Sequence, residues 1–124
     1  MSDLASRACV PCRGGVPPLT EEQMAPLLAQ VDADWRVVER PSPKNGMIKI
    51  LTRSYRFSDF AQALHAAVLV GEMADEQHHH PDLHISWARL EVEIWTHKIG
   101  GLTESDFIFA AKCDALVEPS RSQT

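Results

Sequence analysis

Residues 82–97 read DLHISWARLEVEIWTH, and apolar and polar side chains alternate twice along this stretch. The apolar members of the alternation are Leu83, Ile85, Trp87, Leu90, Val92 and Ile94. A period of two is that of a β-strand with one buried face. Two such strands joined by a short connection predict an antiparallel hairpin whose apolar face packs on another layer.

Three segments outside this hairpin carry helix signals. Thr20 and Gln23 form a capping box before a first helix, which Pro26 is expected to distort because proline lacks an amide donor. Ser58 is expected to cap a long helix that runs to about Gln77. Its apolar positions at helical spacing are Phe60, Leu64, Ala67, Val68 and Gly71. Thr103 and Asp106 form a second capping box, which opens the last helix.

Two more strands are predicted between the first and second helices. Residues 35–40 (WRVVER) and 47–53 (MIKILTR) alternate, and a proline-containing turn over residues 41–46 separates them. The element order is therefore α-β-β-α-β-β-α. This order predicts an α+β, two-layer sandwich in which helices pack on one face of a four-stranded antiparallel sheet.

The length of 124 residues predicts one domain, over residues 19–118. Residues 1–18 are expected to be an irregular, exposed arm, and residues 119–124 a flexible tail. The formal net charge of −5 argues against direct nucleic-acid binding, which depends on clustered basic residues. No apolar run approaches the roughly 20 residues that span a bilayer, so no membrane contact is expected.

Three cysteines and the absence of a secretory signal favour a reducing cytoplasm. Cys9 and Cys12 form a CxxC pair that could bind zinc or cycle as a disulfide. No second pair completes a four-ligand zinc site, and an exposed arm explains the pair as well.

Six histidines are present, and three of them are consecutive, from His78 to His80. If the long helix reaches His79, Asp75 lies four residues before it and could fix the tautomer of its imidazole. His97 is expected on the polar face of the hairpin's second strand. Trp87 and Trp95 are expected near one end of the sheet, where aromatic surface beside imidazoles would suit acid–base chemistry on a planar heterocycle.

The spacing of these residues resembles the signature of the pterin-4a-carbinolamine dehydratase family. Three residues separate Asp75 from His79-His80-Pro81, and Trp87, His97 and Asp106 follow after five, nine and eight more. Every defined position of the signature matches. Phe57–Phe60 and Trp35 also resemble the family, and the likeness covers roughly residues 19–116.

The resemblance implies dehydration of 4a-hydroxytetrahydropterin to quinonoid dihydropterin and water, without metal or cofactor. In the family this recycles the pterin of aromatic amino acid hydroxylases, and the proteins are homodimers or homotetramers. By resemblance His79 and His97 are the acid–base pair, and His80 orients the substrate and shares in proton transfer. Asp75 and Asp106 support them, although capping alone also explains Asp106. The resemblance places the substrate against His78, Pro81, Trp87, Trp95, Thr96 and Lys98.

Two other hypotheses remain open at this point. The histidines at 78–80, 84 and 97 could ligate zinc in a metalloenzyme, although adjacent histidines on a helix point in different directions. Members of the family also serve as dimerisation partners of a transcription factor, and related folds assist enzyme assembly. A non-enzymatic partner role on the same fold is therefore the alternative to catalysis.

Overall fold

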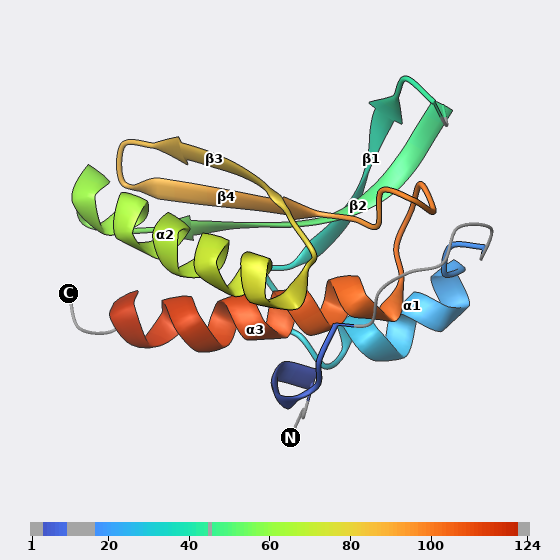
Figure 1. Ribbon diagram of the computed structural model, residues 1–124, viewed down its shortest axis with the longest axis horizontal. Coiled ribbons are helices and arrows are strands. Elements are labelled where there is room, and N and C mark those ends of the chain that lie inside the picture. Colours follow the sequence, from blue (N-terminus) through green and yellow to red (C-terminus); the bar gives the residue numbers. More distant parts are fainter. Residues whose placement is uncertain (1–3, 10–16, 45, 122–124) are drawn as a thin grey trace.

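The computed structural model describes residues 4–9, 17–44 and 46–121. In chain order the elements are η1 (a 3-10 helix, Leu4–Ser6), α1 (Glu21–Leu28), β1 (Arg36–Ser42), β2 (Gly46–Arg56), α2 (Phe60–Gln77), β3 (Asp82–Ser86), β4 (Arg89–Ile94) and α3 (Glu104–Arg121). The four strands form one antiparallel sheet in the order β1-β2-β4-β3. The three α-helices cover one face of it (Figure 1). The predicted two-layer α+β fold is confirmed, and so is the order of its elements.

The second strand of the predicted hairpin, β4, lies in the centre of the sheet beside β2, and the first, β3, lies at an edge. Leu90, Val92 and Ile94 of β4 are fully buried against the helices. Strand β4 pairs with β2 in the register Leu51–Ile94 and Tyr55–Leu90, so apolar side chains from both central strands share the helix-facing side. No helix in the described part of the chain combines the length and hydropathy that a membrane crossing needs.

The turn predicted over residues 41–46 is shorter than expected. Strand β1 continues through Pro41 to Ser42, and Pro41 pairs with Met47. Proline lacks an N–H and is tolerated in a sheet where its strand lies at an edge. Since β1 is an edge strand, the sheet accommodates a residue that sequence reasoning assigned to a turn.

Helix α2 differs from the prediction in its cap and in its buried face. The N-cap is Asp59, whose side chain accepts a hydrogen bond from the Gln62 backbone, so the assignment of Ser58 was wrong by one residue. The buried side of α2 consists of Ala63, Ala66, Ala67, Val70, Met73 and Ala74. Phe60, Leu64 and Val68 are 43–50% exposed. Small side chains let the helix approach the other layers closely, and the larger apolar stripe is left facing solvent.

The expectation of an exposed N-terminal arm is wrong at two positions, although Ser6, Arg7 and Ala8 are exposed as expected. Leu4 is fully buried and Cys9 is 8% exposed, and both belong to the core under α3. The Cys9 backbone donates a hydrogen bond to Gln77 Oε1, which ties this segment to the end of α2. Cys12 lies outside the described residues. At the other end of the chain, α3 continues to Arg121 and so includes the start of the expected tail.

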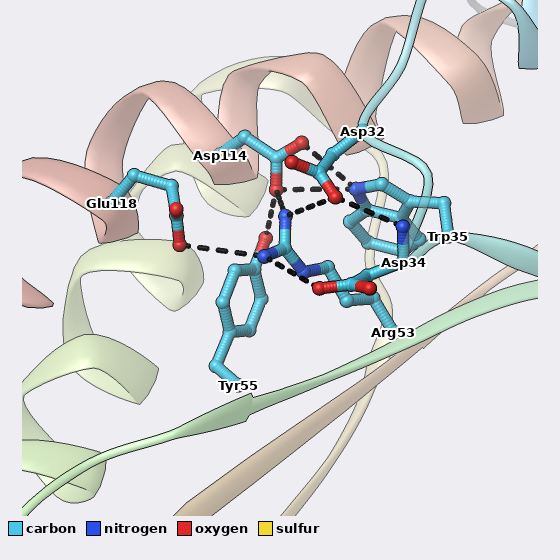
Figure 2. Close-up of polar contacts among 7 residues, drawn as sticks. All are labelled: Asp32, Asp34, Trp35, Arg53, Tyr55, Asp114 and Glu118. Carbon is cyan, nitrogen blue, oxygen red and sulfur yellow. Dashed lines mark hydrogen bonds and ion pairs between the residues drawn. The ribbon is translucent and has the colours of Figure 1, made fainter.

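A buried guanidinium joins the sheet to α3. The Arg53 side chain is 2% exposed, and its Nη1 lies 2.7 Å from Asp114 Oδ1. Asp114 also accepts hydrogen bonds from the Tyr55 hydroxyl and from Trp35 Nε1. Figure 2 shows Arg53 surrounded by four carboxylates, those of Asp32, Asp34, Asp114 and Glu118. This cluster fixes β2, α3 and the α1–β1 connection relative to one another.

Burial sets the titration of the two acids at the centre of the cluster. Burial raises the pKa of the Asp114 carboxyl, although Tyr55 and Arg53 both pull it down. Burial, with the nearby Cys113 and Asp114, likewise raises the pKa of the Tyr55 hydroxyl. The folded chain therefore binds a proton at Asp114 more readily than the unfolded chain does. This contribution to stability is present below the unfolded pKa and is lost as the pH rises through the folded value.

We expect Arg53→Met to destabilise the protein by roughly 3–5 kcal/mol, because Asp114 would remain buried without its cation. Urea unfolding followed by circular dichroism measures this change. Lys49→Ala is the control, since it removes only the solvent-exposed pair with Glu21 and should cost at most about 1 kcal/mol. Equal costs for the two variants would contradict a structural role for the buried pair.

Candidate active site

The histidine run begins where α2 ends. His78 adopts a left-handed conformation, with φ 55° and ψ 38°. The His79 N–H donates to the Ala74 carbonyl and the His78 N–H to the Asp75 carbonyl, which is the pattern of a Schellman motif. The chain therefore reverses at His78, and His79 leaves the helical spiral. The predicted i,i+4 contact between Asp75 and His79 is absent for this reason.

The carboxylate that holds His79 is that of Asp106. His79 Nε2 lies 2.6 Å from Asp106 Oδ1, and Asp106 is fully buried. The imidazole is 14% exposed and contacts the Phe109 ring edge-on, with centroids 5.9 Å apart. An ionised carboxylate only accepts hydrogen bonds, so Nε2 is the donor. The neutral imidazole then has Nδ1 as an unprotonated nitrogen.

The second oxygen of Asp106 accepts hydrogen bonds from two further segments of the chain. Oδ2 accepts from the Thr103 backbone N–H at 2.8 Å and from the Thr96 hydroxyl at 2.9 Å. The first of these contacts is the one that the capping box predicted at the start of α3. The same side chain thus contacts both the helix terminus and the imidazole.

Thr96 brings His97 into the same neighbourhood. Strand β4 ends at Ile94, and Thr96 forms an isolated antiparallel bridge with Gly101. The expectation that His97 lies on the strand is therefore wrong, because the side chain stands in the turn that follows. There the exposed imidazole stacks on Trp95, with ring centroids 4.3 Å apart and an interplanar angle of 25°.

Gly101 allows this turn to pack against the chain before α1. A Cβ added at Gly101 would lie 2.6 Å from Pro18 Cβ, so no other residue fits without a shift. The Leu19 N–H donates to the Leu102 carbonyl beside this contact. The turn that carries His97 is held on both sides, by Asp106 through Thr96 and by residues 18–19.

His80 and Asp75 form a separate, exposed pair. His80 Nε2 lies 2.9 Å from Asp75 Oδ1, and the two side chains are 62% and 81% exposed. Asp75 therefore supports His80 instead of His79. An exposed pair of this kind fixes the orientation of a ring weakly, because solvent competes for both partners.

The remaining predicted residues divide between this region and its surroundings. His78 is exposed at the end of α2, Pro81 is partly buried before β3, and Lys98 is exposed beside His97. Trp87 is 73% exposed in the β3–β4 turn, at the other end of β4 from Trp95. A six-residue strand extends about 20 Å, so the expectation that both tryptophans lie at one end of the sheet is wrong.

Sequence reasoning missed Phe109, which contacts His79 from the first turns of α3. Phe109 lies in the apolar run of residues 107–111, where it looks like any other core position, and nothing in its spacing distinguishes it. Thr96 was expected near the substrate, whereas its hydroxyl is turned to Asp106 and Thr103.

Comparison with known proteins shows which family the chain resembles. The family model described as "Pterin 4 alpha carbinolamine dehydratase" matches residues 17–116. The chain belongs to this family. A protein of Rubrobacter xylanophilus, provisionally named a pterin-4-alpha-carbinolamine dehydratase, is 50% identical over 116 residues, 94% of this chain and all of the relative. A similarly named protein of Rickettsia canadensis is 43% identical over 117 residues, again 94% of this chain and all of the relative.

Solved structures show the same fold. A transcriptional coactivator/pterin dehydratase from Brucella melitensis matches with a TM-score of 0.68 and 30% identity, over 81% of this chain and 98% of its own. A pterin dehydratase-like protein identified as a RuBisCO assembly factor in the alpha-carboxysome matches with a TM-score of 0.54 and 20% identity. The match covers 68% of this chain and 89% of that protein, and it shows a common fold only.

We expect Asp106→Ala to destabilise the protein by roughly 2–4 kcal/mol, because three donors lose their acceptor in or near the core. Chemical denaturation measures the change. Asp75→Ala is the matched control, since its carboxylate is 81% exposed and bonds only one exposed imidazole, and it should change stability by at most about 0.5 kcal/mol. A cost for Asp106→Ala no larger than that of the control would contradict the central place of Asp106.

Proposed function

We propose that this protein dehydrates 4a-hydroxytetrahydropterin to quinonoid dihydropterin and water by acid–base catalysis with histidine side chains. The observation that carries the proposal is the contact between buried Asp106 and His79, because it selects one tautomer of a nearly buried imidazole. Membership of the family supports the substrate class, since the family model and the relatives share that description.

The reaction removes one N–H proton from the ring and one hydroxyl from C4a. Nδ1 of His79, unprotonated while Nε2 bonds Asp106, is the base that takes the ring proton. The electron pair left on nitrogen forms a C=N bond as the C4a–O bond breaks. His97, protonated beforehand, gives its proton to the departing hydroxyl, which leaves as water. No metal or cofactor takes part in these steps.

The exposure of the two imidazoles fits their different tasks. His79 is largely enclosed, and Phe109 and Asp106 hold its ring, so it presents one nitrogen in one direction. His97 is exposed on Trp95 and can exchange its proton with solvent after each turnover. His80, oriented by Asp75, binds the substrate from the rim and shares in proton transfer.

We place this reaction in the cytoplasm, where it recycles the pterin cofactor of an aromatic amino acid hydroxylase. The alternative is a non-enzymatic partner role on the same fold. It is favoured by the names of two structural relatives, one a transcriptional coactivator as well as a dehydratase and one an assembly factor. A binding role needs neither the Asp106–His79 contact nor the stacked His97, so we prefer catalysis.

The assay is dehydration of chemically prepared 4a-hydroxytetrahydropterin, followed by the change in ultraviolet absorbance. We expect His79→Ala and His97→Ala to lower kcat by about 10²–10⁴-fold, which is the usual contribution of a general acid or base. His65→Ala is the control, since His65 is exposed on α2 and matches no position of the family signature. If wild-type protein and both variants were equally inert, the enzymatic proposal would fail and the partner role would stand.

We also propose that the protein forms homodimers or homotetramers through α2. Phe60, Leu64 and Val68 follow one another at four-residue spacing and are 43%, 44% and 50% exposed. Residues four apart share a helix face, so they form one apolar stripe on the solvent side of α2. Contiguous exposed apolar surface of this kind is typical of protein–protein contacts.

We expect Leu64→Glu to shift the protein to a smaller assembly in sedimentation equilibrium, because a charge would lose its hydration in the contact. Ala25→Glu introduces the same charge at an exposed position of α1 and should leave the mass unchanged. A wild-type mass equal to one chain at all concentrations tested would refute assembly.

A further inference from the structure

The face of the sheet opposite the helices carries a cluster that the pterin chemistry does not use. His84 of β3 and Glu91 and Glu93 of β4 each direct one ligand-type atom into a common region, and these atoms lie within 4.8 Å of one another. Within the described part of the chain, it is the one group of at least three histidine, cysteine or acidic side chains whose ligand atoms lie this close together. The histidine run at 78–80 takes no part in it.

The strand register produces this convergence. His84 stands directly opposite Glu91 in the β3–β4 pair, and Glu93 follows two residues later on the same face of β4. His84 Nε2 reaches diagonally to Glu93 Oε1 at 3.0 Å. Because residues at i and i+2 of a strand share a face, both carboxylates point away from the helices, toward the imidazole.

The two oxygens of Glu93 have different neighbours. Oε2 accepts a hydrogen bond from Arg40 Nη2 at 2.7 Å, while Oε1 is turned to His84. The Glu93 side chain is 10% exposed, whereas those of Arg40 and His84 are 47% and 54% exposed. One oxygen of Glu93 is therefore held by Arg40, and the other is directed at the imidazole.

We propose that His84, Glu91 and Glu93 bind one divalent transition-metal ion, of which Zn²⁺ is the representative. The ion would replace the proton on His84 Nε2, and Arg40 would hold the far oxygen of Glu93, as an outer-shell partner commonly does for a metal-bound carboxylate. One imidazole and two carboxylates form a ligand set that zinc accepts in four-coordination, with water as the fourth ligand. An imidazole ligand disfavours Ca²⁺ and Mg²⁺, which prefer oxygen alone.

The site would act on the sheet and not on the pterin. Strand β3 lies at an edge of the sheet and pairs with β4, so an ion shared by the two strands would fasten this edge. The proton-transfer residues lie after the end of β4 and under α3, on other elements. Zinc binding and dehydration are therefore separable, and the metal site does not rest on the proposed function.

The test is titration of chelator-treated protein with Zn²⁺ against a chromophoric competitor. We expect one ion per chain for the wild type. His84→Ala and Glu93→Gln should weaken binding by more than about tenfold, since even the loss of an outer-shell partner costs 10–100-fold. His84 is exposed on an edge strand, so His84→Ala should fold even if Glu93→Gln does not, and circular dichroism without metal checks this.

Three control variants separate this site from other ligands. His65→Ala, His80→Ala and Cys12→Ser should each keep the wild-type affinity for Zn²⁺, because none of these residues is in the ligand set. His65 tests an exposed histidine on a helix, His80 tests the histidine run, and Cys12 tests the CxxC pair. Co²⁺ bound in place of Zn²⁺ should show no thiolate charge-transfer band. The proposal is overturned if the wild type shows no saturable 1:1 binding, or if binding survives His84→Ala and is lost in His80→Ala or Cys12→Ser.

Discussion

Three segments meet at the carboxylate of Asp106, and their meeting creates the candidate active site. The side chain is fully buried and accepts from His79 after α2, from Thr96 after β4 and from the Thr103 backbone before α3. A buried carboxylate without donors costs several kcal/mol, so each of these segments is held in place by the need to satisfy it. Since Thr96 precedes His97, the same constraint holds the turn that carries the imidazole of His97.

Charged residues have different tasks on the two faces of the sheet. On the helix side, Arg53 is enclosed among four carboxylates and neutralises the one that is most deeply buried, Asp114. On the open side, Glu93 is the nearly buried group, and half-exposed Arg40 and His84 contact its two carboxylate oxygens from the rim. The first arrangement is closed and fits a structural role. The second leaves an imidazole and two carboxylates converging at an accessible surface, which suits an ion.

The fold could be predicted because strand alternation and helix capping depend on residues only a few positions apart in the sequence. The alternation through Leu90, Val92 and Ile94 identified the central strand, and the Thr20–Gln23 capping box was confirmed in full. The predictions were wrong where the place of a residue in the sheet or in the core decides its conformation or its burial. Pro41 lies in a strand because that strand is an edge, and Phe60, Leu64 and Val68 face solvent because the alanines of α2 make the close contact.

The sequence by itself determined the element order, the family and the set of histidines that the family signature selects, since spacing along the chain carries all three. Only the tertiary structure decided which acid serves which imidazole. Asp75 loses His79 because the chain reverses at His78, and Asp106 gains it from 27 residues away. It also decided that His84, outside every motif, stands opposite Glu91. Both outcomes depend on contacts between elements that are distant in sequence, and no local pattern of residues contains that information.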